Sequence, residues 1–203
     1  MNLSDHIIQT VGFPEGRESP LMFGANRWDW LPRLFTEAGF TIGAEIGVGG
    51  GRFSERLCQA VPGLRLLYAI DPWEVGEYYE GRVSRWQMEG SFNRAVFRLA
   101  SLNCQIVKKR SLEAVQDFPD NALDFVYIDA NRTYQSVWDD LAAWTAKVRP
   151  GGIISGCCYY DESREIGMVK SAVDDWTYGS GGEIDPWFVA VHHRYPVYFW
   201  EKR

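Results

Sequence analysis

The chain has 203 residues, of which 46% are hydrophobic and 24% are charged, and its formal net charge is -6. This composition is typical of a globular protein and excludes a disordered or fibrous chain. The acidic balance, without a dense block of Lys and Arg, argues against a nucleic-acid partner. No apolar run approaches the roughly 20 residues of a membrane helix, and the first residues lack the regions of a signal peptide.

The chain contains four cysteines and no C-x-x-C spacing; they are Cys58, Cys104, Cys157 and Cys158. Because adjacent cysteines can bridge only through a strained ring, we expect all four to be reduced thiols. Reduced thiols favour a cytoplasmic location.

The predicted elements begin with a turn-rich segment, 1–27, which we expect to be an arm or lid with at most a short helix. A helix is predicted over 28–40, with Pro32 near its start and Gly39 at its end. Strands and helices then alternate. The expected strands are 41–48, 64–70, 105–109, 123–129, 153–156, 187–191 and 197–202, and the expected helices are 52–61, most of 76–103, 111–118, 134–148 and 167–176.

Strands that alternate with helices predict βαβ units and a parallel sheet, while the last two strands are typical of a closing hairpin. We therefore expect an α/β fold with a Rossmann-like, doubly wound sheet of seven strands, mostly parallel, with an antiparallel C-terminal strand. The whole of 1–203 is expected to be one domain. In it, 1–39 is an N-terminal arm and helix, 40–160 is a cofactor-binding core, and 161–203 holds the last helix and the hairpin.

A glycine-rich segment, residues 47–51 (Gly-Val-Gly-Gly-Gly, here called the glycine loop), follows the first of these strands. Glycines let the backbone approach a ligand closely, and such a loop lies where open parallel sheets bind ligands. A dinucleotide fingerprint needs a third glycine at position 52, but Arg52 stands there. Glu45, two residues ahead of the loop, would repel a pyrophosphate but suits a sulfonium cofactor that carries an ammonium group. Alone, the loop also fits a simple tight turn.

A second acid, Asp71, ends the next expected strand, 22 residues after Gly49. This separation suits a carboxylate that accepts hydrogen bonds from ribose hydroxyls. Asp71-Pro72 is also an ordinary strand-ending turn, but its position beside the glycine loop favours contact with a cofactor.

Four segments together resemble a family, the class I S-adenosylmethionine-dependent methyltransferases. They are AEIGVGGGRFSERL, YAIDPW, LDFVYIDANRTY and VRPGGIISG, and they stand in the family's order and spacing over about residues 40–160. Within the class, the chain is similar to the small-molecule O-methyltransferase-like branch (methyltransferase domain family 24-like). The resemblance implies S-adenosylmethionine as cofactor and S-adenosylhomocysteine as product.

The resemblance also implies which residues contact the cofactor. Asp71 would hold the ribose, the loop at Arg110 and Ser111 would lie by the adenine, and Asp129 would lie near the transferred methyl. Trp73 could equally be a core residue, and Ser111 could also cap the helix that starts there. The full predicted set is Glu45, Gly47, Val48, Gly49, Asp71, Pro72, Trp73, Arg110, Ser111, Asp129 and Ala130.

Two residues are candidates for catalysis. Asp129 is the first, because it ends a strand on the cofactor side of the expected sheet. His192 ends the sixth expected strand and could be a general base, since histidine titrates near neutral pH. The alternative is that His192 and His193 are solvated residues of a hairpin turn.

A divalent metal is not expected. In the metal-dependent branch of the family, the position of Asp129 binds the cation together with an acidic pair after the fifth strand. Here Cys157 and Cys158 occupy that pair, and thiols do not suit hard cations. Asn131 and Arg132 also replace the acidic and histidine residues that often follow, although Asp161 could substitute as a ligand.

The sequence leaves the acceptor open. Residues 74–92 are rich in Tyr, Trp and Arg and, with Tyr159 and Tyr160, could hold a sugar or an aromatic ring. The same aromatics could bury a second subunit, so a homo-oligomer is an option. We expect methyl transfer to a small-molecule hydroxyl, with no nucleic acid and no membrane as partner. The alternatives are a non-catalytic cofactor-binding or scaffold protein of this fold and an NAD-dependent oxidoreductase.

Overall fold

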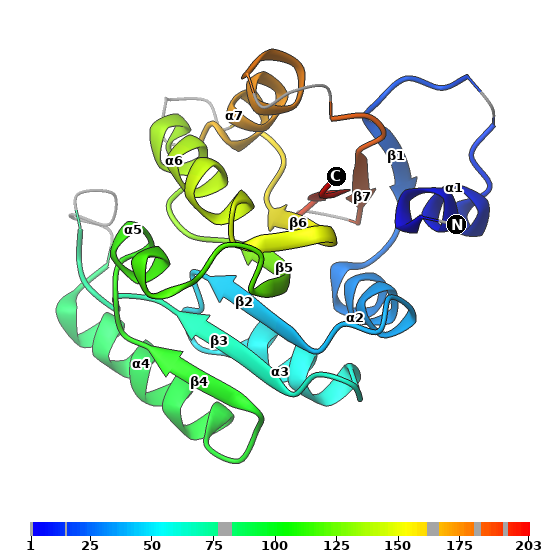
Figure 1. Ribbon diagram of the computed structural model, residues 1–203. Coiled ribbons are helices and arrows are strands. Elements are labelled where there is room, and N and C mark those ends of the chain that lie inside the picture. Colours follow the sequence, from blue (N-terminus) through cyan, green and yellow to red (C-terminus); the bar gives the residue numbers. More distant parts are fainter. Residues whose placement is uncertain (1, 15, 77–82, 162–166, 181–183, 193–194) are drawn as a thin grey trace.

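The computed structural model describes residues 2–14, 16–76, 83–161, 167–180, 184–192 and 195–203 (Figure 1). Its strands are β1 (Leu21–Gly24), β2 (Ile42–Ile46), β3 (Leu66–Ile70), β4 (Cys104–Val107), β5 (Leu123–Ile128), β6 (Val148–Cys157), β7 (Phe188–Val191) and β8 (Val197–Glu201). Its α-helices are α1 (Leu3–Val11), α2 (Arg27–Glu37), α3 (Arg52–Ala60), α4 (Arg85–Leu99), α5 (Ser111–Ala114), α6 (Tyr134–Thr145) and α7 (Val169–Asp175). A 3-10 turn (Val115–Asp117) follows α5, and a π-helical segment (Trp176–Ser180) follows α7.

The described strands form one sheet in the order β1-β7-β8-β6-β5-β2-β3-β4. All neighbours are parallel except the two pairs that include β8. The predicted Rossmann-like, mostly parallel sheet with an antiparallel C-terminal strand is confirmed. The direction of winding reverses between β2 and β5, so the crevice in which such sheets bind ligands lies at the carboxyl ends of these two strands.

The number of strands differs from the expectation, because the sheet has eight strands and not seven. The additional strand, β1, lies in the segment 1–27 that we expected to be an arm with at most a short helix. It has only four residues and therefore no readable periodicity, and it is stabilised by parallel pairing with β7, where Leu21 faces Phe188 and Gly24 faces Val191. The expected short helix is α1, which Asn2 caps by accepting a hydrogen bond from the backbone N–H of Asp5.

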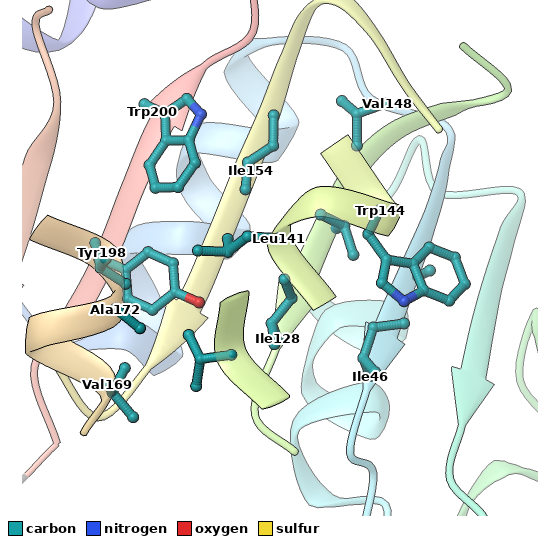
Figure 2. Close-up of a cluster of buried hydrophobic side chains, with 14 of the residues drawn as sticks. Ile46, Ile128, Leu141, Trp144, Val148, Ile154, Val169, Ala172, Tyr198 and Trp200 are labelled. Carbon is teal, nitrogen blue, oxygen red and sulfur yellow. The ribbon is translucent and has the colours of Figure 1, made fainter. Parts of the chain in front are cut away.

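Helices cover both faces of the sheet and bury its side chains. On one face, α5, α6 and α7 pack against the sheet around Leu141, Trp144 and Tyr198 (Figure 2). On the other face, α1, α2 and α3 enclose a second cluster, and α4 adds a smaller third one. Side chains of β5 alternate between the faces, so Phe125 and Tyr127 enter the second cluster while Val126 and Ile128 enter the first. Both faces of the central strands are therefore apolar, as in a doubly covered parallel sheet.

The strand β6 begins earlier than the sequence indicated. We expected Val148 to close a helix and residues 150–152 to follow it as a stop, but Val148 already pairs with Leu123. The pairing shifts register between Leu123 and Phe125, and two glycines make this irregularity feasible. Gly151 has a φ of 75°, and a Cβ on Gly152 would overlap the backbone of Asp124.

None of the helices in the described ranges is long and apolar enough to cross a membrane.

Candidate active site

The glycine loop connects β2 to α3 and is pressed against the chain that follows β5. Three of its residues have positive φ, with values of 90° at Gly47, 54° at Gly49 and 78° at Gly51. The N–H of Gly47 donates to the carbonyl of Ile70 at 2.8 Å. A Cβ on Gly47 would overlap the backbone of Asp129, so only glycine allows the loop to approach this closely. The glycine loop and the strand end at Asp129 are thus direct neighbours.

The carboxylate of Asp71 holds the glycine loop in place. Its Oδ2 accepts a hydrogen bond from the backbone N–H of Gly49 at 2.9 Å, and its Oδ1 accepts one from the N–H of Trp73 at 2.7 Å. The indole Nε1 of Trp73 donates in turn to the carbonyl of Gly49 at 2.8 Å. Burial raises the pKa of Asp71, although the backbone N–H groups oppose this shift. Loop and strand end therefore form one hydrogen-bonded unit.

This unit fits a nucleoside cofactor. Nothing lies within 4 Å of the position that a Cβ on Gly49 would take, so the backbone is open there. Both oxygens of Asp71 accept hydrogen bonds from backbone N–H groups, and a carboxylate with about four acceptor sites keeps capacity for a ribose hydroxyl. The structure brings together most of the predicted cofactor residues, namely Gly47, Val48, Gly49, Asp71, Pro72, Trp73, Asp129 and Ala130, and their contact with a cofactor stays a prediction.

Two side chains of this set point into the protein. Val48 and Trp73 are each 6% exposed and pack in the small cluster that α4 covers. The ring centroids of Trp73 and Phe92 lie 4.9 Å apart there. Glu45 is 2% exposed beneath the glycine loop and accepts a hydrogen bond from Ser54. Burial raises the pKa of Glu45 to about 8. Its carboxyl group is therefore neutral near pH 7 in this structure, and a direct contact with the cofactor stays a prediction.

The loop at Arg110 and Ser111 lies after β4, but the expected helix cap is wrong. Arg110 is the N-cap residue, and the cap has no side-chain hydrogen bond. Ser111 instead points into the protein, where it donates to the carboxyl group of Asp140 and accepts from the indole of Trp144 at 2.8 Å. Burial raises the pKa of Asp140 to about 7. The guanidinium of Arg110 pairs with Glu74 at 3.1 Å, which links the loops that follow β3 and β4.

Asp129 lies between two arginines. Nη1 of Arg27 is 3.2 Å from Oδ2 of Asp129, and Nη2 of Arg132 is 3.7 Å from Oδ1. The same Nη1 of Arg27 donates to the hydroxyl of Tyr127 at 2.8 Å and to Sγ of Cys157 at 2.7 Å. Arg27 is the first residue of α2. The strand β1 pairs with β7 and ends shortly before α2 begins, and this pairing brings Arg27 to its position beside Asp129. Sequence reasoning missed Arg27, because no local motif marks it and the strand that places it was not predicted.

Three potential metal ligands meet at the same point. Carboxylate and thiol atoms of Asp129, Cys157 and Cys158 all lie within 4.8 Å of one another. The thiols hydrogen-bond to each other at 2.9 Å, and this contact, together with burial, raises the pKa of Cys157. A guanidinium already contacts two of the three residues, since Arg27 binds Asp129 and Cys157. The expectation of no metal stays a prediction.

The other candidates have separate environments. His192 follows β7 and is exposed, and because β7 is parallel to β1 and β6, it lies at the same edge of the sheet as Asp129. Its partner His193 lies outside the described residues. Tyr159 is buried and donates to Asp174 at 2.6 Å, which indicates packing, whereas the hydroxyl of Tyr160 accepts from Arg132 at 3.4 Å. Asp161 accepts hydrogen bonds from Ser171 and is not in the group of potential metal ligands.

A cavity of about 580 Å³ adjoins the site at Trp73. It lies between α4 and the loops after β3 and β4, and its lining includes Trp73, Glu74, Met88, Phe92 and Lys108. The described part of the aromatic segment 74–92 therefore borders the side of the site at Trp73 and not the arginines at Asp129. Residues 77–82 of that segment lie outside the described residues.

A mostly parallel sheet with a glycine loop and an acidic strand end at its switch point defines a Rossmann-like class of cofactor-binding α/β proteins. A family model described as "Methyltransferase domain" matches residues 44–156, which is more than half of the chain. The chain therefore belongs to this methyltransferase family. This confirms the resemblance to class I S-adenosylmethionine-dependent methyltransferases and decides against the NAD-dependent alternative.

Solved structures of O-methyltransferases have the same fold. A putative O-methyltransferase from Klebsiella pneumoniae is 16% identical, with a TM-score of 0.64 over 99% of this chain and 90% of that one. An O-methyltransferase from Bacillus cereus in complex with S-adenosylhomocysteine is 17% identical, with a TM-score of 0.64 over 98% and 90%. TomG from Streptomyces achromogenes, involved in tomaymycin synthesis and in complex with S-adenosylmethionine, is 17% identical, with a TM-score of 0.64 over 99% and 89%. No curated protein matches the chain significantly in sequence.

Proposed function

We propose that this methyltransferase transfers the methyl group of S-adenosylmethionine to a hydroxyl group of a small-molecule acceptor. The observation that carries the proposal is the direct contact between the glycine loop, which Asp71 holds, and the strand end at Asp129. A cofactor that lies over Gly49 and binds Asp71 would place its reactive end toward Asp129. The O-methyltransferases of the same fold support the choice of oxygen as the acceptor atom.

Each part of the site has a role in this proposal. Asp71 accepts hydrogen bonds from the ribose, and the bare backbone at Gly47 and Gly49 lies along the methionine moiety. The bound cofactor supplies a methyl group on a positively charged sulfur, which an acceptor oxygen displaces directly. Asp129 orients the acceptor, and such alignment supplies much of the rate acceleration in direct displacements. His192, at the same edge of the sheet, accepts the proton of the hydroxyl.

Further parts of the proposal concern the whole chain. We propose that 1–203 acts as one methyltransferase domain in the cytoplasm, where its four free cysteines stay reduced. An acceptor with a sugar or aromatic hydroxyl suits the aromatic residues around the site. A homo-oligomer is supported by α4, on which Trp86 and Phe97 are 80% and 87% exposed, because large apolar side chains on one surface often mark interfaces.

The first experiment is thermal unfolding with S-adenosylhomocysteine, S-adenosylmethionine and NAD, after a check that the purified protein carries no trapped cofactor. A ligand at about 100 times its dissociation constant adds roughly 2.7 kcal/mol to the free energy of unfolding. For a chain of this size the midpoint should rise by roughly 5–10 °C. We expect this shift with the two adenosyl-sulfur ligands and none with NAD; the reverse result would contradict the proposal.

The second experiment is a methyl-transfer assay with a panel of sugar and aromatic hydroxyl compounds. Transfer to oxygen by the natural chain, and its loss in the Asp71→Ala variant, is the expected result. Cofactor binding without transfer to any compound would favour the alternative, a non-catalytic cofactor-binding or scaffold protein.

A further inference from the structure

The guanidinium of Arg27 is fixed on one side by polar groups and on the other by aromatic rings. Its Nη1 contacts Tyr127, Asp129 and Cys157. Its central carbon, Cζ, lies over three aromatic rings. The distance from Cζ to the ring centroid is 5.1 Å for Trp28, 5.6 Å for Phe53 and 5.7 Å for Tyr195. Cation–π contacts of this length hold a guanidinium without using its N–H groups. The side chain is only 17% exposed, so its position is set by the protein and not by solvent.

Most of the hydrogen-bonding capacity of Arg27 is unused. A guanidinium has five N–H donors, and all three contacts to polar groups involve Nη1, which carries two of them. Among the described residues, no acceptor binds Nε or Nη2 of Arg27. These atoms are also not among the buried polar atoms that lack a partner, so they stay accessible from outside the protein. A fixed pair of donors on one side of a guanidinium matches the two oxygens of a carboxylate or one strongly charged oxygen.

The charge of the surrounding groups also favours an anion. Arg27 and Arg132 face one carboxylate, that of Asp129. Both guanidinium groups lie at the edge of the sheet, beside the backbone of Asp129 that contacts the glycine loop, so an anion bound there is attracted by two positive charges.

We propose that the methyl acceptor binds as an anion, with a negatively charged oxygen held by Nε and Nη2 of Arg27 and attracted by Arg132. This inference rests on the proposed function and assigns the substrate class of that site. The charged oxygen is either a carboxylate of the acceptor or its ionised hydroxyl group. The guanidinium of Arg27 contacts two of the three potential metal ligands, Asp129 and Cys157. In this proposal the guanidinium, and not a metal ion, supplies the positive charge that the acceptor oxygen meets.

The experiment compares the binding of charged and neutral probes of similar size to the full chain saturated with S-adenosylhomocysteine. Benzoate is compared with benzamide, and 4-nitrophenolate with 4-nitroanisole, by calorimetry at one pH above the pKa of the phenol. We expect the anion of at least one pair to bind about tenfold more tightly than its neutral partner. Preference within the first pair alone indicates a carboxylate, and preference within the second pair indicates an ionised hydroxyl.

Variants on one helix connect this preference to Arg27. In Arg27→Gln the preference should fall below about threefold, and Arg27→Lys should retain part of it, because lysine keeps the charge but not the fork of donors. The control is Arg33→Gln, also on α2, whose guanidinium pairs with Glu37 at 2.7 Å on the surface. It should behave like the natural chain. Affinity for S-adenosylhomocysteine should stay within about threefold in all variants, which shows that they are folded.

The inference and the proposed function can fail separately. If S-adenosylhomocysteine binds but neutral probes bind as tightly as anions, or if no anion binds, the inference is wrong and the proposed function stands. It is also wrong if Arg27→Gln keeps the full preference, or if benzoate binds only with a Zn²⁺ ion at Asp129, Cys157 and Cys158. If S-adenosylhomocysteine does not bind to the natural chain, the proposed function fails and this inference with it.

Discussion

The carboxyl edge of the sheet has two halves that are built in different ways. The cofactor half consists of the glycine loop, Asp71 and Trp73, which lie close together in the sequence and are joined by hydrogen bonds between side chains and the backbone. The acceptor half joins Arg27 to Asp129 and Cys157, which are 102 and 130 residues away, through side chains. In the cofactor half each of these hydrogen bonds has one backbone partner, so the glycines are needed as well as the side chain of Asp71. The acceptor half is made of side chains and can change its ligand by single substitutions.

The largest effect is expected from substitutions within the glycine loop. Gly47→Ala should lower the free energy of unfolding by about 2–4 kcal/mol, because the new Cβ overlaps the backbone of Asp129. Gly49→Ala should cost only about 1 kcal/mol, since its φ of 54° is strained for alanine but no atom lies within 4 Å of the Cβ. The second variant should nevertheless lose at least about tenfold in affinity for S-adenosylhomocysteine.

Urea denaturation and calorimetry measure these two quantities. Equal losses of stability in the two glycine variants would contradict the close contact between the halves at Gly47.

Asp71→Ala tests whether the cofactor half can be damaged alone. We expect affinity for S-adenosylhomocysteine to fall about 100-fold, because the variant loses the proposed ribose acceptor and the hydrogen bonds from the N–H groups of Gly49 and Trp73. Binding of benzoate should change by less than about threefold. The control is Asp117→Ala, an exposed acid that pairs with Lys109 on the surface. Unchanged cofactor affinity in Asp71→Ala would refute the assignment of the ribose.

A pH dependence of stability should come from two buried carboxyl groups, those of Glu45 beneath the glycine loop and of Asp140 on α6. Burial raises the pKa of Glu45 from 4.5 to about 8 and that of Asp140 from 3.8 to about 7. The native state keeps these two protons while the unfolded chain releases them, so the free energy of unfolding should fall as pH rises from about 5 to about 8. We expect a decrease of roughly 1–3 kcal/mol over this range.

The matched variants are Glu45→Gln and Asp140→Asn, each of which should flatten the profile that urea denaturation gives. A profile that rises with pH, or one that both variants leave unchanged, would contradict these buried protonated carboxyls.

Asp129→Asn tests the boundary between the halves and should have the smallest effect. Removing the carboxylate charge between Arg27 and Arg132 should strengthen benzoate binding by about tenfold, because less negative charge competes for the arginines. Affinity for S-adenosylhomocysteine should change by less than about threefold, while turnover of any acceptor found should decrease. Calorimetry separates the outcomes: an equal loss of cofactor and benzoate binding would show that Asp129 only holds the site together.

The two halves also differ in how far the sequence predicts them. Glycine spacing and the acid at Asp71 identify the cofactor half, because a strand, a loop and the next strand end follow each other in the chain. The acceptor half depends on Arg27, whose position is set by pairing between β1 and β7, and a four-residue strand carries no periodic signal. The prediction that Ser111 caps the helix is wrong for a similar reason. Its hydroxyl group is bound by Asp140 and Trp144, which are distant in the sequence and carry no local signal.

The pairing of β1 with β7 has a consequence for synthesis. Ser19 and Trp187, which are hydrogen-bonded at the start of these strands, are 168 residues apart. At roughly 5–20 residues per second, the first strand leaves the ribosome about 10–30 s before its partner exists. During that interval the apolar residues of β1 need shielding, and non-local pairing of this kind is slow. A nascent chain stalled before residue 188 would therefore carry a complete glycine loop while Arg27 still lacks the strand pairing that places it.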